Sequence, residues 1–251
     1  MPRFFVRKEQ IVDGTVVILG DDAHHISRSL RMAEGENITV CDMQKNEYSC
    51  TLTGFLPDRV LARVDDTVKC DTEPPFEARL FQALPKGEKL DSLIQKSVEC
   101  GVSSITTFTS ERCIVKEKGE EENKLRRRNR ISLEAAKQSG RGIVPEVYPT
   151  VSFTDMLKKA MEADIRLFCY EGDGTRSMKE VLKTERANLS CDISHCPSIS
   201  IVIGSEGGFS LAEVDKARAA GLIPVGLGKR ILRTETASSF VLSCLVYEFE
   251  L

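Results

Sequence analysis

Several features that mark common functional classes are absent from this chain of 251 residues. Its nine cysteines form no C-x-x-C pair and accompany only three histidines, a pattern that matches neither a disulfide framework nor a zinc-ligand spacing. No stretch approaches the roughly 18 consecutive apolar residues that span a bilayer, and residues 1–6 lead into charged residues rather than a secretory signal. We therefore expect a soluble, cytoplasmic protein with reduced, mostly buried thiols and no bound metal.

The phosphate-binding motifs of nucleotide enzymes are missing as well. Neither G-x-x-x-x-G-K-[ST] nor G-x-G-x-x-G occurs, which disfavours a P-loop NTPase and leaves a dinucleotide-binding fold without its fingerprint. We find no convincing Ser-His-Asp or Cys-His set either. The usual nucleophilic enzymes are therefore disfavoured.

The overall charge also argues against bulk binding to nucleic acid, because the net charge is −3 and the isoelectric point is near 5.8. Residues 112–141 differ locally, with ten Lys or Arg against five Glu. This stretch, centred on Arg126, Arg127 and Arg128, fits a surface that faces phosphates. On charge alone, a solvated helix face explains it equally well.

The pattern of predicted elements changes once along the chain. Residues 1–72 read as short strands with one helix near 22–31, which suggests a small β-barrel. Residues 71–75 carry a Pro pair and form a plausible linker. From 73 to 251, strands alternate with helices, which favours a mostly parallel α/β sheet.

Two glycine-rich turns follow successive strands of this second part, at 204–208 and 226–228. Glycine tolerates positive φ and has no Cβ, so backbone there can approach a ligand closely. Two such turns without a phosphate motif indicate a nucleoside-type ligand, although each could be a plain turn. Arg230 and Arg233 share the next segment with Glu235, where a surface ion pair is the competing interpretation. Glu206, within the first turn, could serve as an acid or base or as a partner of the following helix dipole.

In order along the chain, these segments resemble the RsmE family of SPOUT methyltransferases. The similarity rests on 2–5, 25–32, 86–89, 94–102, 110–113, 134–141, 203–208 and 227–237, including the strings Gln138-Ser139-Gly140-Arg141 and Leu227-Gly228-Lys229-Arg230-Ile231-Leu232-Arg233-Thr234-Glu235-Thr236-Ala237. One departure is visible. The family usually reads Gly-Pro-Glu-Gly-Gly where this chain has Ser205, which makes the turn looser and adds a donor.

The resemblance implies an N-terminal PUA-like β-barrel that binds RNA (1–72) and a C-terminal α/β SPOUT domain with a deep trefoil knot (73–251). It also implies a homodimer, S-adenosylmethionine as cofactor, and methylation of N3 of a uridine in 16S ribosomal RNA of the small subunit. The expected cofactor residues are Gly204, Glu206, Gly207, Gly208, Leu227, Gly228, Ile231, Leu232, Arg233, Thr234 and Ala237. The expected RNA contacts are Arg3, Arg28, Arg31, Arg112, Arg126, Arg127 and Arg128.

This chemistry assigns roles to a few side chains. The N3 proton must be removed and the resulting uracil anion held, a task that suits the permanently charged, planar guanidinium. Arg141 and Arg233 are the candidates for it, and Glu206, Glu235 or water could be the base. Two alternatives share much of the sequence evidence: a SPOUT enzyme that methylates a ribose 2′-OH, and a non-enzymatic ribosome-assembly factor that binds RNA.

Overall fold

The computed structural model describes residues 1–115, 121–189 and 196–251. Part of the basic stretch, residues 116–120, lies outside the described residues. The chain divides into two units, one made of Met1–Glu73 with Ala136–Val144 and the other of Pro74–Ala135 with Pro145–Leu251. The first unit therefore includes a segment that is distant from it in sequence.

The first unit is built on a six-stranded sheet of order β1-β4-β5-β6-β3-β2. Its strands are β1 (Arg3–Phe5), β2 (Ile11–Val12), β3 (Thr15–Leu19), β4 (Asn37–Cys41), β5 (Asn46–Phe55) and β6 (Arg59–Lys69). Only β1 and β4 pair in parallel. The helical segments are η1 (Lys8–Gln10), α1 (Gly20–His24) and the π-helical η2 (His25–Ser29). The sequence patterns at 15–19, 37–41, 47–52 and 60–64 predict four of these strands, which the structure confirms, whereas β1 and β2 were not predicted.

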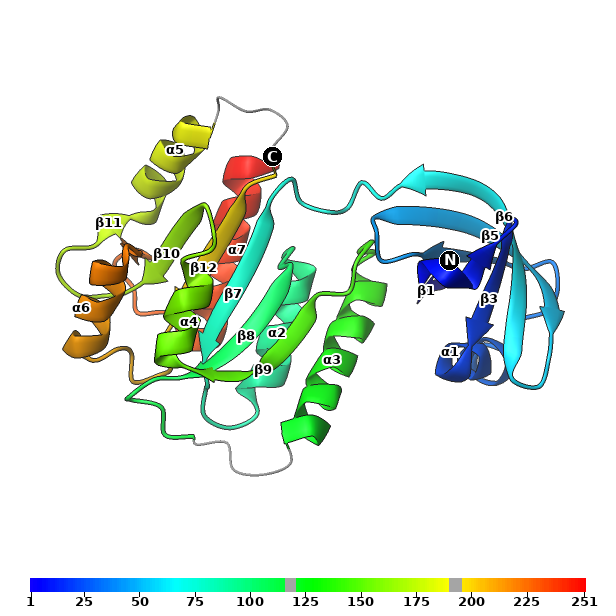
Figure 1. Ribbon diagram of the computed structural model, residues 1–251, viewed down its shortest axis with the longest axis horizontal. Helices are drawn as coiled ribbons and strands as arrows, with labels where there is room; N and C mark the ends of the chain where they lie inside the picture. Colours follow the sequence, from blue (N-terminus) through cyan, green and yellow to red (C-terminus); the bar gives the residue numbers. More distant parts are fainter. Residues whose placement is uncertain (116–120, 190–195) are drawn as a thin grey trace. The chain divides into compact units, whose positions relative to one another are not determined.

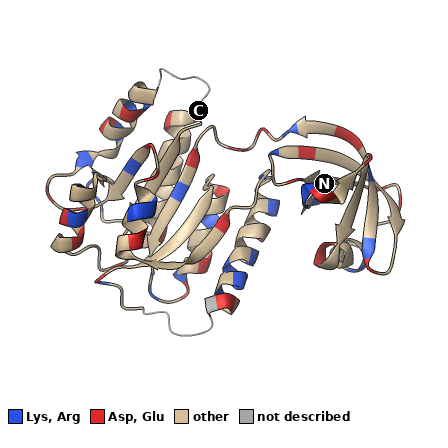
Figure 2. Cartoon of the chain, viewed as in Figure 1, with Lys and Arg blue, Asp and Glu red and all other residues tan. Residues whose placement is uncertain are grey.

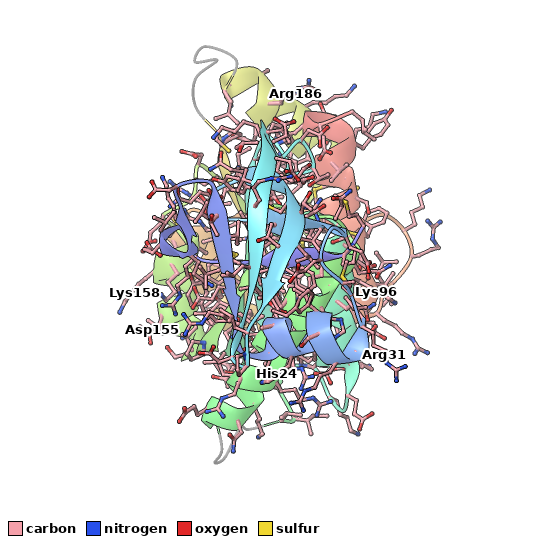
Figure 3. The ribbon with its side chains drawn as sticks, turned by 90° about the vertical axis from the view of Figure 1, so that its right-hand side faces the viewer. His24, Arg31, Lys96, Asp155, Lys158 and Arg186 are labelled. Atoms are coloured by element: carbon pink, nitrogen blue, oxygen red, sulfur yellow. The ribbon has the colours of Figure 1, made fainter. Side chains whose placement is uncertain are left out.

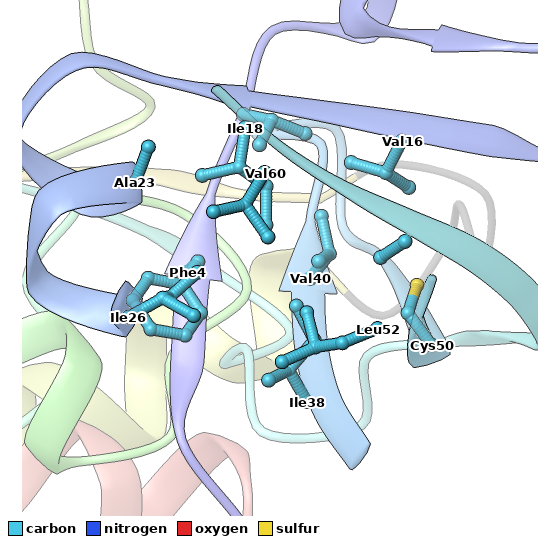
Figure 4. Close-up of a cluster of buried hydrophobic side chains, with 12 residues drawn as sticks. Phe4, Val16, Ile18, Ala23, Ile26, Ile38, Val40, Cys50, Leu52 and Val60 are labelled. Atoms are coloured by element: carbon cyan, nitrogen blue, oxygen red, sulfur yellow. The ribbon is translucent and has the colours of Figure 1, made fainter. Parts of the chain in front are cut away.

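The core of this unit follows from alternation along its strands. In β3, Val16 and Ile18 are buried while their neighbours are not, as expected for a strand with one face on the core. They pack with Phe4, Ile26 and Ile38 in one cluster (Figure 4). The first unit therefore has a hydrophobic core of its own.

The second unit contains a seven-stranded sheet of order β11-β13-β10-β12-β7-β8-β9, in which every pairing is parallel. Its strands are β7 (Glu77–Ala83), β8 (Ser104–Thr109), β9 (Glu146–Ser152), β10 (Ile165–Cys169), β11 (Arg176–Ser177), β12 (Ser198–Ile203) and β13 (Ile223–Gly226). The expected α/β class is confirmed. Strand β12 lies near the middle, and its residues Ile199–Ile203 are all buried, as both faces of a parallel sheet are covered.

Helices cover both faces of this sheet (Figure 1). They are α2 (Lys89–Glu99), α3 (Glu121–Gln138), α4 (Phe153–Ala160), α5 (Met178–Leu189), α6 (Leu211–Ala220) and α7 (Thr234–Phe249). Helices α2 and α7 pack against each other, and α7 also contacts β12. Helices α4 and α6 share another cluster, in which Met156 and Val214 surround Phe168 and Phe209. Because helices pack on both of its faces, the sheet is a rigid support for the loops that follow the carboxyl ends of its strands.

Local sequence signals explain how α6 begins and ends. The Ser-x-x-Glu pattern at 210–213 predicts a capping box, and the structure confirms it, with the Ser210 hydroxyl accepting from the Glu213 amide at 3.2 Å. Gly221 ends the helix in the left-handed region, at φ 96°. The segment that enters α6 is the first glycine turn, so the capping box also fixes the exit of that turn.

Two global expectations can be compared with the structure. No helix of the described chain is both long and apolar enough to cross a membrane. The eight cysteines in the described ranges are free thiols, as expected, but only Cys41 and Cys50 are buried. The expectation of mostly buried thiols is wrong, because five of the other six cysteines are half-buried and Cys196 is exposed.

Candidate cofactor pocket

A pocket of about 450 Å³ opens in the second unit, beyond the carboxyl ends of β10, β12 and β13. Such crevices are where open α/β sheets bind ligands. Ten of the eleven cofactor residues expected from the sequence line it together: Gly204, Glu206, Gly207, Gly208, Leu227, Ile231, Leu232, Arg233, Thr234 and Ala237. Gly228 is the exception. The structure therefore joins two segments separated by a helix and a strand into one cavity.

Other lining residues were not predicted from the sequence. They are Arg112, Cys169, Tyr170, Glu171, Ile203, Ser205, Phe209 and Leu211. Tyr170 and Glu171 directly follow β10, which pairs with both β12 and β13. The sequence does indicate a crevice there, because residues 171–174 turn beyond the carboxyl end of a strand, although no residue of this strand was among the expected cofactor residues.

The glycine turn at 204–208 needs its glycines for different reasons. Gly208 lies at φ 64° and its N–H donates to the Ser205 carbonyl at 2.9 Å. A Cβ on Gly204 would lie 3.1 Å from Phe209 Cε2, and one on Gly207 would lie 3.0 Å from Arg112 Cβ. Gly228 differs, since a Cβ there meets nothing within 4 Å and only its φ of 107° favours glycine. Protein atoms therefore do not require glycine at 228, its positive φ favours glycine, and its expected close approach to the cofactor stays a prediction.

Buried polar side chains tie the start of this turn to the sheet and to α7. The Gly204 carbonyl accepts from Thr234 Oγ1 at 2.7 Å and from Gln82 Nε2 at 3.3 Å. Gln82 Nε2 also donates to Thr234 Oγ1 at 2.8 Å. Both side chains are buried, so these bonds are shielded from water. They fix β7, the first turn and the start of α7 relative to one another.

Glu206, in the middle of the turn, is held by Lys89 and Lys86. Lys89 Nζ donates to Glu206 Oε1 at 2.6 Å, and the Lys86 N–H lies 3.2 Å from both carboxylate oxygens. Partial burial acts to raise the pKa of Glu206, but the hydrogen bonds from Lys89 and Lys86 outweigh it and hold that pKa below its usual range. Lys89 Nζ also lies 3.8 Å from Glu235 Oε2. Glu206 is thus a fixed anion, which makes it a weak proton acceptor near neutral pH.

Arg112 contacts the turn at Gly207. Its Nη1 donates to the Gly207 carbonyl at 3.0 Å. The segment before it is anchored by Glu213, only 1% exposed, which accepts from Ser110 Oγ at 3.1 Å and from the Glu111 N–H at 2.9 Å. Arg112 therefore lies at the pocket, and its expected contact with RNA stays a prediction.

The structure places Arg141 in the first unit, and the side chain is not among the residues that line the pocket. Arg141 Nε and Nη2 donate to the two oxygens of Glu73 at 2.9 and 2.8 Å, and the side chains are 3% and 4% exposed. The N–H groups of Gly142 and Ile143 also donate to Glu73 Oε1, at 2.8 and 3.2 Å. Burial acts to raise the pKa of Glu73, but Arg141 and these two amides hold it below its usual range.

The arginines expected to contact RNA in the first unit differ in their surroundings. Arg3 is paired with Glu47 at 2.8 Å and also donates to Cys41 Sγ at 2.8 Å. Arg28 and Arg31 are exposed, and Arg31 projects outward from the ribbon (Figure 3). These two are therefore more available to a ligand than Arg3.

Basic residues follow one another along α3 (Figure 2). Arg126 is paired with Glu122 at 3.1 Å, and Arg127 is paired with Asp91 of α2. Both arginines are largely exposed. The carboxylates offset part of the charge that the sequence indicated, and RNA binding by Arg126, Arg127 and Arg128 stays a prediction.

Comparison with known proteins finds two family models that match this chain. Residues 72–246 match the RNA methyltransferase domain, and residues 18–64 match the RNA methyltransferase PUA domain. Ribosomal RNA small subunit methyltransferase E of Bacillus subtilis is 35% identical, over 100% of this chain and 98% of that protein. The protein of the same name from Mesomycoplasma hyopneumoniae is 32% identical, over 97% and 98%.

A solved structure extends the similarity to the fold. The ribosomal RNA small subunit methyltransferase E of Neisseria gonorrhoeae, bound to S-adenosyl methionine, superposes with a TM-score of 0.82. It is 32% identical, with 98% of this chain and 97% of that chain covered. The family model covers more than half of this chain, and the pocket lies at the carboxyl edge of a parallel sheet. The chain therefore belongs to the RNA methyltransferase family, as its resemblance to the RsmE family indicated.

Proposed function

We propose that this chain transfers a methyl group from S-adenosylmethionine to N3 of a uridine in the RNA of the small ribosomal subunit. The observation that carries the proposal is the pocket at 203–209 and 227–237, in a chain whose Neisseria relative is bound to S-adenosyl methionine. The curated relatives named above act on small-subunit ribosomal RNA by name.

The pocket residues fit this cofactor. A volume of about 450 Å³ lies in the ordinary range of small-molecule sites. Leu227, Leu232 and Tyr170 offer apolar surface to a nucleoside, and the glycine turns let main-chain groups approach it. The carboxylates of Glu171 and Glu206 complement the positive charge of the cofactor, whose sulfonium supplies an activated methyl group. Positioning of that methyl group can then account for much of the rate.

Arg233 is the residue we assign to the uracil anion. It lines the pocket at the residue that precedes α7, and its guanidinium can donate two coplanar hydrogen bonds to uracil oxygen. Glu206 acts as an anion that holds the turn rather than as the base, because its pKa is lowered by Lys89 and Lys86. Arg141 acts structurally, by neutralising the buried Glu73. Glu235, whose Oε2 lies 3.8 Å from Lys89 Nζ, and water remain the candidates for the base.

Several architectural features belong to the same proposal. The resemblance to the SPOUT enzymes supports a trefoil knot in 73–251, a PUA-like β-barrel in 1–72, and a homodimer in the cytoplasm. Exposed Phe240 and Tyr247 lie seven residues apart on α7, which offers an apolar stripe to a second copy. Analytical ultracentrifugation of the wild type and of Tyr247→Asp tests the dimer.

The decisive experiment is methyl transfer from labelled S-adenosylmethionine to small ribosomal subunits that lack the modification, followed by mapping of the methylated atom. We expect label at N3 of one uridine and a marked decrease with Arg233→Gln. Label on a ribose 2′-oxygen would contradict the position. Tight RNA binding with no calorimetric binding of S-adenosylmethionine would indicate an assembly factor instead of an enzyme.

A further inference from the structure

The loop between β13 and α7 carries an unusual group of cations beside the pocket. Lys229, Arg230 and Arg233 fall within five residues and all are exposed. Within the described ranges, none of the three side chains has a carboxylate or a hydrogen-bond partner. Ile231, between them, lines the pocket and is 84% exposed. The mouth of the pocket therefore carries unneutralised positive charge in a protein whose net charge is −3.

Other basic groups are less available for a ligand. Arg126 and Arg127 of α3 are paired with Glu122 and Asp91, and Lys137 donates to Asp22 at 2.8 Å. A cation that already has a carboxylate partner must give up part of that interaction to bind a phosphate. Lys229 and Arg230 incur no such loss.

The loop that presents these cations is anchored at both ends. Thr234 at its end is buried and bonded to the Gly204 carbonyl at 2.7 Å. At its start, Val225 of β13 pairs with Cys169 of β10, and Gly228 makes the following turn at φ 107°. Short anchored loops lose less conformational entropy on binding than free ones. The cations are thus placed directly beside the residues proposed to hold the cofactor.

We propose that Lys229 and Arg230 bind the RNA phosphates that flank the target nucleotide, and so dock the substrate at the mouth of the pocket. The inference rests on the proposed function, because it names the surface by which that pocket receives RNA. Phosphate contacts fix the register of a nucleic acid, and a base must leave its stack before chemistry can reach it. Two cations beside the pocket would fix the register of the RNA. They would also hold its backbone at the place where the unstacked base enters the pocket.

The test compares the double variant Lys229→Gln/Arg230→Gln with the matched Lys179→Gln/Lys183→Gln on α5, where neither lysine is an expected RNA contact. Both remove two cations from exposed positions, so the comparison isolates location. Binding of a small-subunit RNA fragment that contains the target is measured between low and high salt. Each lost phosphate contact lowers the slope of log affinity against log salt by about 0.7 on single-stranded RNA, so the first variant should lose about 1.4. The control should lose less.

Two further measurements keep this result separate from the proposed function. Calorimetry should show unchanged S-adenosylmethionine affinity in the Lys229→Gln/Arg230→Gln variant, and ultracentrifugation should show an unchanged association state. An unchanged salt slope in that variant, with a wild type that methylates the RNA, overturns the inference alone. A change in association state instead would assign the loop to contact with a second copy and also overturns it. A wild type that neither binds S-adenosylmethionine nor methylates RNA would remove the proposed function itself.

Discussion

Replacing Arg141 with Gln should destabilise the first unit rather than impair the chemistry. Within the described residues, Glu73 accepts four hydrogen bonds and would lose the two from Arg141, including the one to Oε2. Breaking a buried ion pair by removing one partner costs about 3–5 kcal/mol, because the remaining charge stays buried. Domain stabilities are only about 5–15 kcal/mol, so this loss is a large fraction of the total.

The assay is urea unfolding followed by circular dichroism, since the chain contains no tryptophan for fluorescence. Two units can unfold in separate steps, so the shift should appear in one transition only. Arg28→Gln, an exposed position of the same unit, is the matched control and should change stability by about 0.5 kcal/mol at most. Arg141→Lys keeps the charge but loses the planar fork, and should fall between the two.

The pH dependence provides an independent check on the same pair. The pKa of Glu73 is lowered in the folded protein, so its contribution to stability is present above the unfolded value of about 4.3 and is lost as the pH falls through the lower folded value. Glu73→Gln should therefore be less stable at neutral pH and lose less stability on acidification. Normal stability of Arg141→Gln with a large decrease in single-turnover methylation would refute this reasoning and return Arg141 to a direct role in catalysis.

Three further predictions concern the turn at 204–208. Gly207→Val should abolish calorimetric binding of S-adenosylmethionine with an unchanged circular dichroism spectrum, because its Cβ would lie 3.0 Å from Arg112 Cβ; unchanged affinity would place the cofactor elsewhere. Lys89→Met should weaken cofactor affinity about fivefold, because it removes the partly exposed ion pair with Glu206, which is worth about 1 kcal/mol. Lys89→Arg keeps the positive charge and should restore most of that affinity. Equal losses in both variants would argue against a charge effect. Glu213→Ala should cost about 2–4 kcal/mol in thermal unfolding, since it removes a helix cap and leaves buried donors unpaired, and a loss below 1 kcal/mol would contradict this.

Much of the fold could be predicted from the sequence. The strands Thr15–Leu19 and Asn37–Cys41 match prediction residue for residue, since alternation or continuous burial sets the residue pattern of a strand. Helix α6 was predicted from its capping box and Gly221 for the same local reason. Strand β9 and helix α5 were not predicted. Strand β9 has only one fully buried position, Val147, and so carries little alternation.

The candidate site likewise combines features that the local sequence predicts with contacts that only the folded chain forms. By itself the sequence determined which glycine turns follow strands and which family the chain resembles, because turn residues and ordered motifs are local features. Only the tertiary structure decided that the two turns line one pocket, that Lys89 and Lys86 fix Glu206, and that Arg141 is paired with a buried Glu73. The Arg141 and Glu73 side chains are 68 positions apart in the chain, and no local pattern encodes such a contact. Whether a charged residue is free to act depends on its partners and its burial, which are set by packing between segments that are distant in sequence.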